Sequence, residues 1–141
     1  MPSVVADANV LISAALARSP NAPSVLILDA ALDGRLELIT PPALLREIAD
    51  VLARPRLRKY LTTDEALRFV TDLASQTTLL SDPTGPHPAV CRDPNDDYLV
   101  ALATAHQANV LVTGDDDLLA INPEALKVEI LTPRQLIDRL D

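Results

Sequence analysis

Aspartate residues follow two short segments of the sequence that have the pattern of buried β-strands. Residues 110–112 (Val-Leu-Val) lead through Thr113 into three consecutive aspartates, of which Asp115 is the first, and residues 4–6 lead into Asp7. Three adjacent carboxylates repel one another, so folding alone gives little reason to place them at the end of a strand. A divalent cation gives such a reason. Two parallel strands would deliver these carboxylates to one edge of a sheet, and the pattern therefore predicts a metal site.

Two further acidic residues are candidates for the same site. Glu47 lies in a predicted helix after the second strand, next to its core stripe, where a glutamate can point across the strand ends. Asp97 begins the apolar part of a later helix and shares a face with small alanine side chains, which allow close packing; Asp96 is the alternative at this position. The candidate catalytic and metal-binding acids are therefore Asp7, Glu47, Asp97 and Asp115.

The residue types in this set favour magnesium or manganese. Mg²⁺ and Mn²⁺ prefer oxygen ligands, and a set of acids without a cysteine or histidine cluster disfavours zinc. Such a cation lowers the pKa of water and neutralises charge on a phosphodiester, which leaves the protein mainly positioning and electrostatics to supply. No serine, histidine and aspartate arrangement is evident in the sequence, and neither His87 nor His106 has an obvious partner.

The polar neighbours of these acids each have two possible roles. Asp93 precedes a proline with the spacing of a helix cap, and it is either that cap or a supporting residue of the metal site. Asp117 offers either a second ligand after Asp115 or a charge at a helix start. Asn9 and Thr113 either orient the ligands by hydrogen bonding or cap their own turns.

The composition limits the class of protein. A chain of 141 residues fits one domain, residues 1–141, and its core must be aliphatic because only 2% of the residues are aromatic. The formal charge of −8 argues against binding nucleic acid through a broad basic surface, although bound metal ions would neutralise part of it. A single cysteine excludes an internal disulfide. Without a signal-peptide pattern or an apolar run long enough to cross a membrane, we expect a cytoplasmic protein.

Strand and helix patterns alternate along the chain, which predicts an α/β fold with a mainly parallel sheet and helices on both faces. Residues 77–80 are a possible additional strand, and residues 81–94 form a predicted loop rich in proline. The predicted strands are 4–6, 36–39, 110–112 and 128–131, and the predicted helices are 10–17, 24–32, 40–53, 62–75, 95–108 and a terminal helix from 133.

The ordered set of these segments resembles the PIN-domain ribonucleases, and above all the bacterial and archaeal branch of toxins from toxin–antitoxin pairs. The matching segments are Val-Ala-Asp-Ala-Asn-Val-Leu-Ile-Ser at 5–13, Leu-Arg-Glu-Ile at 45–48, Arg-Asp-Pro-Asn-Asp-Asp at 92–97 and Val-Thr-Gly-Asp-Asp-Asp-Leu-Leu at 112–119. No single motif is decisive, but their order and spacing over residues 4–119 are fairly specific.

That resemblance implies a three-layer α/β/α sandwich and cleavage of single-stranded or structured RNA that depends on Mg²⁺ or Mn²⁺. It also implies a homodimer and a small antitoxin protein that blocks the site. Carried over by motif, the metal-binding acids are Asp7, Glu47, Asp97 and Asp115, with Asp117 auxiliary and Asn9 and Thr113 supporting.

Basic residues are concentrated in one short segment, which contains Arg54, Arg56, Arg58 and Lys59. Together with Arg46 on the preceding helix, this segment is a candidate contact for the RNA backbone or for the acidic tail of an inhibitor protein. A solvated connection between two helices is the alternative. Because aromatic residues are scarce, base stacking contributes little to the choice of RNA.

Other functions account for part of the pattern. A receiver-type signalling module also binds Mg²⁺ at strand ends, but it needs an acidic neighbour for Asp7 and a late lysine that Lys127 does not match. A haloacid-dehalogenase-type phosphatase needs Asp-x-Asp after the first strand, where this chain has Asp7-Ala8-Asn9. A non-catalytic binding or scaffold protein with the same fold is the remaining alternative, and the full set of acids argues against it.

Overall fold

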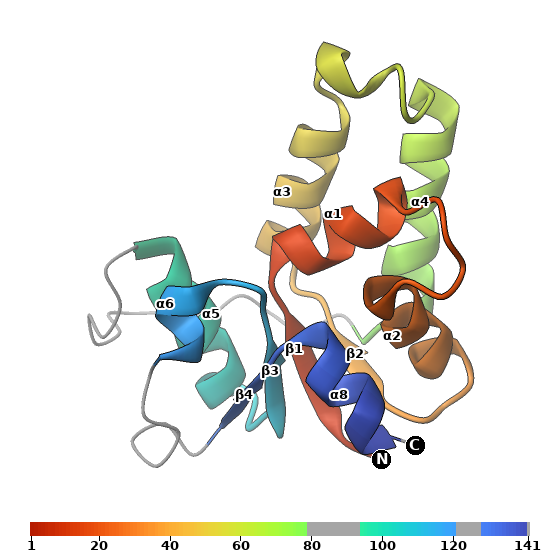
Figure 1. Cartoon of the computed structure of the whole chain (residues 1–141). Coiled ribbons are helices and arrows are strands. Elements are labelled where there is room, and N and C mark those ends of the chain that lie inside the picture. Colours follow the sequence, from red (N-terminus) through yellow and green to blue (C-terminus); the bar gives the residue numbers. More distant parts are fainter. Residues whose placement is uncertain (79–93, 121–127, 141) are drawn as a thin grey trace.

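Four parallel strands form the centre of the fold, with helices on both sides (Figure 1). The computed structural model describes residues 1–78, 94–120 and 128–140. The strands are β1 (Ser3–Ala6), β2 (Glu37–Ile39), β3 (Val110–Val112) and β4 (Glu129–Leu131), in the order β2-β1-β3-β4. The chain thus adds β2 on one side of β1 and then adds β3 and β4 on the other side. At such a reversal, a parallel sheet leaves a crevice beyond the carboxyl ends of its strands.

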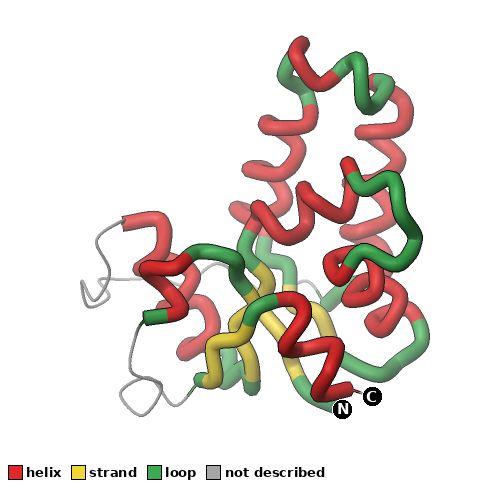
Figure 2. The backbone as a smooth tube through the Cα atoms, in the orientation of Figure 1, coloured by secondary structure: helices red, strands yellow, loops and turns green. Residues whose placement is uncertain are grey.

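Helices lie on both faces of the sheet (Figure 2), and alternate residues of the strands belong to two separate cores. Val4 and Val110 belong to the core on one face, and Val5 and Leu111 belong to the core on the other. Five helices contribute to the first core in the described part of the chain: α1 (Ala8–Leu16), α2 (Pro23–Leu32), α3 (Pro42–Leu52), α4 (Thr63–Gln76) and α8 (Pro133–Leu140). The second face is covered by α5 (Pro94–Ala105) and α6 (Asp116–Leu119). The predicted α/β/α sandwich with a parallel sheet is confirmed.

Local capping explains where several helices begin and end. Thr62 and Glu65 form a reciprocal capping box at the start of α4, and Thr132 and Gln135 exchange the same pair of hydrogen bonds at the start of α8. After α2, Gly34 adopts a left-handed conformation with φ of 76°, which lets the next N–H donate back to the carbonyl of Ala30 (2.9 Å).

Most of the predicted elements are present, and the differences have local causes. The helix predicted over 95–108 ends at Ala105, because Gln107 takes a left-handed conformation (φ of 53°) and the helix closes as α2 does at Gly34. The strand predicted over 77–80 is reduced to a single bridge between Thr78 and Ile39, and residues 79–80 lie outside the described residues. The predicted loop over 81–94 also lies outside them, except for Pro94, which begins α5. The short helices α6 and η1 (Pro55–Leu57) were not predicted.

The helices α3 and α4 form a hairpin that projects away from the sheet, with η1 at its tip and α1 packed beside it (Figure 1). The stripe Leu44, Ile48 and Leu52 is the buried face of α3. This packing fixes the orientation of α3 relative to α1, and therefore of Glu47 relative to the start of α1. No helix in the described ranges is long and apolar enough to cross a membrane.

We expect Leu11→Ala to lower the free energy of unfolding by about 2–5 kcal/mol, because Leu11 of α1 is fully buried and its truncation leaves a cavity. The matched control is Leu67→Ala in α4, where 66% of the side chain is exposed and the effect should stay within about 0.5 kcal/mol. Urea denaturation of both variants measures the difference. Equal losses would show that α1 does not anchor this core.

Candidate metal centre

Every strand of the sheet is followed directly by a threonine or an aspartate. Asp7 follows β1, and Thr40, Thr113 and Thr132 follow β2, β3 and β4. The pairing of β1 with β3 sets Ala6 opposite Val112, so that Asp7 and Thr113 leave the sheet side by side. Asp7, Thr40 and Thr113 are buried. The carboxyl edge of the sheet therefore presents oxygen atoms in a row, with Asp7 near its middle.

The Asp7 carboxylate is held at both of its oxygens. Its Oδ1 accepts a hydrogen bond from the backbone N–H of Asn9 (3.1 Å), and its Oδ2 accepts one from the hydroxyl of Thr113 (3.0 Å). Its own backbone N–H continues the sheet by donating to the carbonyl of Val112 (2.9 Å). Asp7 is only 8% exposed, so these bonds replace most of its water. The carboxylate thus also caps α1, and its position is set from two directions.

Thr113 connects Asp7 with Asp115. While its hydroxyl donates to Asp7, the same oxygen accepts a hydrogen bond from the backbone N–H of Asp115 (3.0 Å). Thr113 has no exposed surface, and Asp115 is half-buried. The carbonyl of Asp115 then accepts from the N–H of Leu119 and starts α6 (3.0 Å). The two acidic motifs are therefore linked by a continuous chain of hydrogen bonds through a buried hydroxyl.

Glu47 approaches Asp7 from the helical layer. Partial burial raises the pKa of the Glu47 carboxyl above its ordinary value, and the negative charge of Asp7 raises this pKa further. Both causes destabilise the ionised carboxylate of Glu47 relative to its protonated form. The two carboxylates, one from the sheet edge and one from α3, are thus close enough to repel each other. A cation between them would remove that repulsion and would meet the hard oxygen ligands that Mg²⁺ or Mn²⁺ prefers.

The structure brings together part of the predicted set. Asp7, Thr113 and Asp115 are joined by hydrogen bonds, and Glu47 lies within the electrostatic influence of Asp7. Asn9 contributes its backbone N–H, whereas its side chain is exposed. Within residues 1–78, 94–120 and 128–140, no group of three or more His, Cys, Asp or Glu side chains is arranged to hold a metal ion. Asp93 lies outside the described residues, as do the side chains of Asp96, Asp97 and Asp117.

The basic segment at residues 54–59 lies at the tip of the α3–α4 hairpin, away from the sheet edge that carries Asp7 (Figure 1). Arg58 has a local role there, because its guanidinium donates to the carbonyl of Leu52 and to the hydroxyl of Thr63 (3.1 Å), and thereby closes the hairpin. Lys59 lies 5.1 Å from the ring centre of Tyr60. Arg54 and Arg56 are exposed.

Thr40 was not singled out by the sequence analysis, although it is buried beside β1. Its hydroxyl lies 2.5 Å from the hydroxyl of Thr77, which also donates to the carbonyl of Leu73 (2.5 Å). This contact ties the end of β2 to the end of α4. The available signal was its place directly after a strand pattern, which it shares with Asp7 and Thr113.

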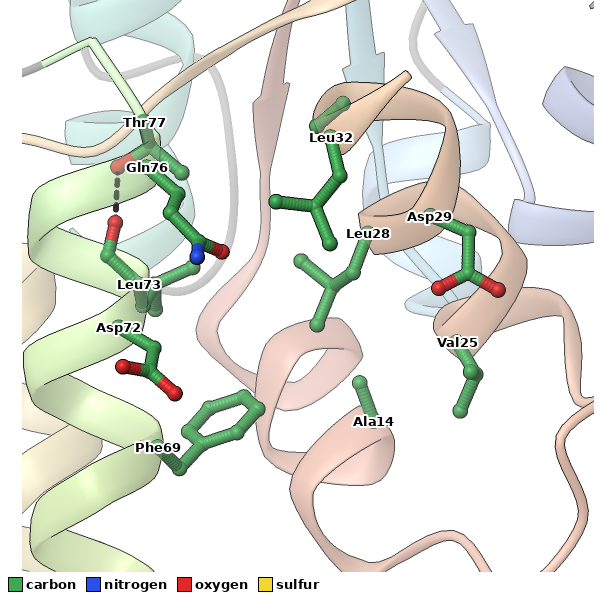
Figure 3. Close-up of a pocket in the computed structure, with 11 residues that line it drawn as sticks. Ala14, Val25, Leu28, Asp29, Leu32, Phe69, Asp72, Leu73, Gln76 and Thr77 are labelled. Atoms are coloured by element: carbon green, nitrogen blue, oxygen red, sulfur yellow. Dashed lines mark hydrogen bonds between the residues drawn. The ribbon is translucent and has the colours of Figure 1, made fainter.

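A groove of about 200 Å³ lies between α1, α2 and α4 (Figure 3). Leu28 and Leu32 of α2 and Phe69 of α4 point into it, with Asp29 and Asp72 among the surrounding side chains. Asp7, Thr113 and Asp115 do not line this groove. Its chemistry is that of an apolar packing surface and not of a second acidic site.

Comparisons with known proteins agree with this architecture. A family model described as "PIN domain" matches residues 3–117. The protein MJ1680 of Methanocaldococcus jannaschii is 30% identical over 146 residues, which cover 98% of this chain and 91% of that protein. Among solved structures, PAE2754 of Pyrobaculum aerophilum has a TM-score of 0.64 at 21% identity, over 99% of this chain and 89% of its own.

Two further solved structures share the fold at lower sequence identity. VapBC2 of Rickettsia felis, bound to a DNA fragment from their promoter, has a TM-score of 0.59 at 12% identity, over 92% of this chain and 98% of that chain. FitAcB of Neisseria gonorrhoeae has a TM-score of 0.54 at 20% identity, over 93% of this chain and 98% of that chain.

We expect Thr113→Val to lower the free energy of unfolding by about 1–3 kcal/mol, because it leaves the Asp7 carboxylate and the Asp115 N–H without their shared partner while keeping the side-chain shape. Thr113→Ser keeps the hydroxyl and is the matched control, with a smaller loss. Urea denaturation measures both. A valine variant as stable as the serine variant would show that this hydroxyl does not hold the two motifs together.

We expect Glu47→Gln to raise the melting temperature of the metal-free protein at pH 7. The raised pKa of Glu47 means that the folded state binds this proton more readily than the unfolded state, so stability falls as the pH rises through that pKa. The gain should therefore vanish well below pH 4.5, the ordinary value of a glutamate. Asp50→Asn, an exposed acid on the same helix, is the control. Thermal melts in EDTA across this pH range test the sign, and a lower melting temperature for Glu47→Gln at pH 7 would contradict it.

Proposed function

This chain belongs to the PIN domain family, and we propose that it is an endoribonuclease that uses Mg²⁺ or Mn²⁺ to hydrolyse phosphodiester bonds of RNA. The observation that carries the proposal is the buried link from Asp115 through Thr113 to Asp7, with Glu47 facing the charge of Asp7. A fold that holds like charges together at the crossover point of its sheet gains nothing in stability from doing so. Holding a cation and a phosphate there accounts for the arrangement.

The cation would be held by carboxylate oxygens. Asp7, Glu47 and Asp115 are the described candidates, and we propose Asp97 of α5 as the fourth ligand, with Asp117 auxiliary. This donor set has only hard oxygen atoms, which suits Mg²⁺ or Mn²⁺. When bound, such a cation activates water and neutralises charge on the phosphate that is cleaved. Asp93 is proposed as a supporting residue.

The residues of the chain would supply positioning. Thr113 fixes one oxygen of Asp7, and the N–H of Asn9 fixes the other, so the carboxylate cannot turn away from its partners. Preset charges cost no reorganisation during the reaction, which is how an electrostatic site lowers a barrier. Glu47 would add its carboxylate from α3, whose backbone position is set by its buried stripe.

We further propose that the protein acts as a toxin paired with a small antitoxin protein, and that it forms a homodimer. The likeness of the fold to the chains solved as VapBC2 and FitAcB supports this direction. The exposed cations Arg46, Arg54, Arg56 and Lys59 are proposed as contacts for RNA or for that partner. Arg58 is less suited to this role, because its guanidinium already binds the end of α3.

The deciding experiment is cleavage of a mixed single-stranded RNA pool in Mg²⁺, Mn²⁺ or EDTA. We expect cleavage with either metal and none in EDTA, and we expect Asp7→Asn and Asp115→Asn each to lower the rate by about 10²-fold or more, since metal-bound charge is worth several kcal/mol in the transition state. Asp116→Asn is the matched control, because Asp116 is the exposed neighbour of Asp115. Its activity should stay close to wild type.

Melting temperatures of the same variants separate loss of chemistry from loss of fold. Cleavage that survives in Asp7→Asn from a clean preparation would refute the assignment of the site. Protein that neither cleaves RNA nor binds metal in calorimetry would favour a non-catalytic scaffold with the same fold.

A further inference from the structure

A pocket of about 350 Å³ borders the candidate metal centre on the side of α2 and α8. Its lining includes Asn9 and Gly114, which are close in sequence to Asp7 and Asp115, and the first residues of α2 and α8. Ser24, which carries a hydroxyl, and the exposed cation Arg134 are among the lining residues. The pocket therefore includes sequence neighbours of the acids, and its mostly apolar lining also contains a residue with a hydroxyl and a residue with a positive charge.

Three helices begin around this pocket, and only one of them lacks a cap. The Asp7 carboxylate caps α1, and Thr132 with Gln135 caps α8. No side chain caps α2, which begins at Pro23 after Ala22. Because proline has no N–H, the free donors at this helix start are the N–H groups of Ser24 and Val25. Such donors, together with the helix dipole, favour an anion.

The Ser24 side chain gives a second and independent indication of a ligand. Ser24 is only 8% exposed, yet within the described residues its hydroxyl has no hydrogen-bond partner. In the same part of the chain, the only buried polar side-chain atom that is both unpartnered and sealed from solvent is Nε of Arg58, so the Ser24 hydroxyl must open onto the pocket. A hydroxyl that opens onto the pocket and has no protein partner is available to bind a ligand there.

We propose that this pocket is a phosphate subsite, which holds the backbone phosphate of an RNA strand adjacent to the phosphate that is cleaved. The N–H groups of Ser24 and Val25, the Ser24 hydroxyl and the Arg134 guanidinium are the donors. That the bound strand is RNA rests on the proposed function. The preference of the pocket for phosphate is independent of the proposed function. The proposed subsite places substrate binding beside the acids and not at the basic tip of the hairpin.

The first test is a titration with inorganic phosphate, followed by ¹H–¹⁵N NMR of the whole chain. We expect the amide signals of Ser24 and Val25 to shift on addition of phosphate, and to shift much less in the double variant Ser24→Ala/Arg134→Gln. Chloride at equal ionic strength is the control. Amide signals that do not respond to phosphate would overturn the subsite.

The second test measures binding of a single-stranded RNA dodecamer by fluorescence anisotropy, with Asp7→Asn as the common background to prevent cleavage. We expect Ser24→Ala/Arg134→Gln to weaken binding about tenfold or more, because hydrogen bonds to a charged group are lost. The dependence of log K on log salt should become shallower by about 0.7, the value for one phosphate of a single strand. The matched control is Arg56→Gln, an exposed cation at the hairpin tip, with a change below about twofold.

The outcomes separate this inference from the proposed function. A phosphate response at Ser24 and Val25 in a protein that cleaves no RNA would support the subsite and count against the ribonuclease. Metal-dependent RNA cleavage with unchanged affinity in the double variant would overturn the RNA subsite and leave the ribonuclease standing. A loss of binding to an acidic peptide without loss of RNA binding would also overturn it, and would identify the pocket as a contact for a protein partner.

Discussion

The hydrogen bond from the Thr113 hydroxyl to the Asp7 carboxylate is the interaction on which the candidate site depends. It joins residues 106 positions apart, and it exists because β1 and β3 pair in parallel with Ala6 opposite Val112. A shift of one residue in this register would turn every side chain of the strand to the other face. The carboxylate would lose its donor, and Val110 and Val112 would leave their core. The register of β1 and β3 therefore sets both the packing of the sheet and the position of the Asp7 carboxylate.

The same constraint forces like charges together. The Asp7 carboxylate is held by Thr113 and Asn9, and the buried stripe of α3 fixes the backbone that carries the exposed Glu47 side chain. Partial burial, and after it the negative charge of Asp7, raises the pKa of the Glu47 carboxyl. Like charges held close together lower the stability of the fold, and such a loss is common at functional sites. A bound cation turns the same repulsion into a set of ligands already in position.

The sequence was sufficient for the sheet and for the edge that carries Asp7 and Asp115, because strands buried on both faces leave a clear apolar pattern and parallel strands share one carboxyl edge. It was not sufficient where local and tertiary effects compete. Gln107 has no glycine signal for its left-handed turn, whereas Gly34 had one. Thr113 allowed two roles, and only the distance to Asp7 distinguishes them. Ser24 looked like any early helix residue, since its meaning depends on α8, more than 100 residues later in the chain.

A chain with a formal charge of −8 has little long-range attraction for a polyanion, so its contacts with nucleic acid must be local. The distribution of its cations agrees with this. Arg58 is used to close a hairpin, and the other cations of that segment lie at its tip, away from the sheet. Arg134 and the uncapped start of α2 lie instead beside Asn9 and Gly114. The phosphates of an RNA strand would thus meet hydrogen-bond donors in the pocket and a cation held by the carboxylates. Because both interactions act over a short range, only strands that fit this edge of the sheet would bind.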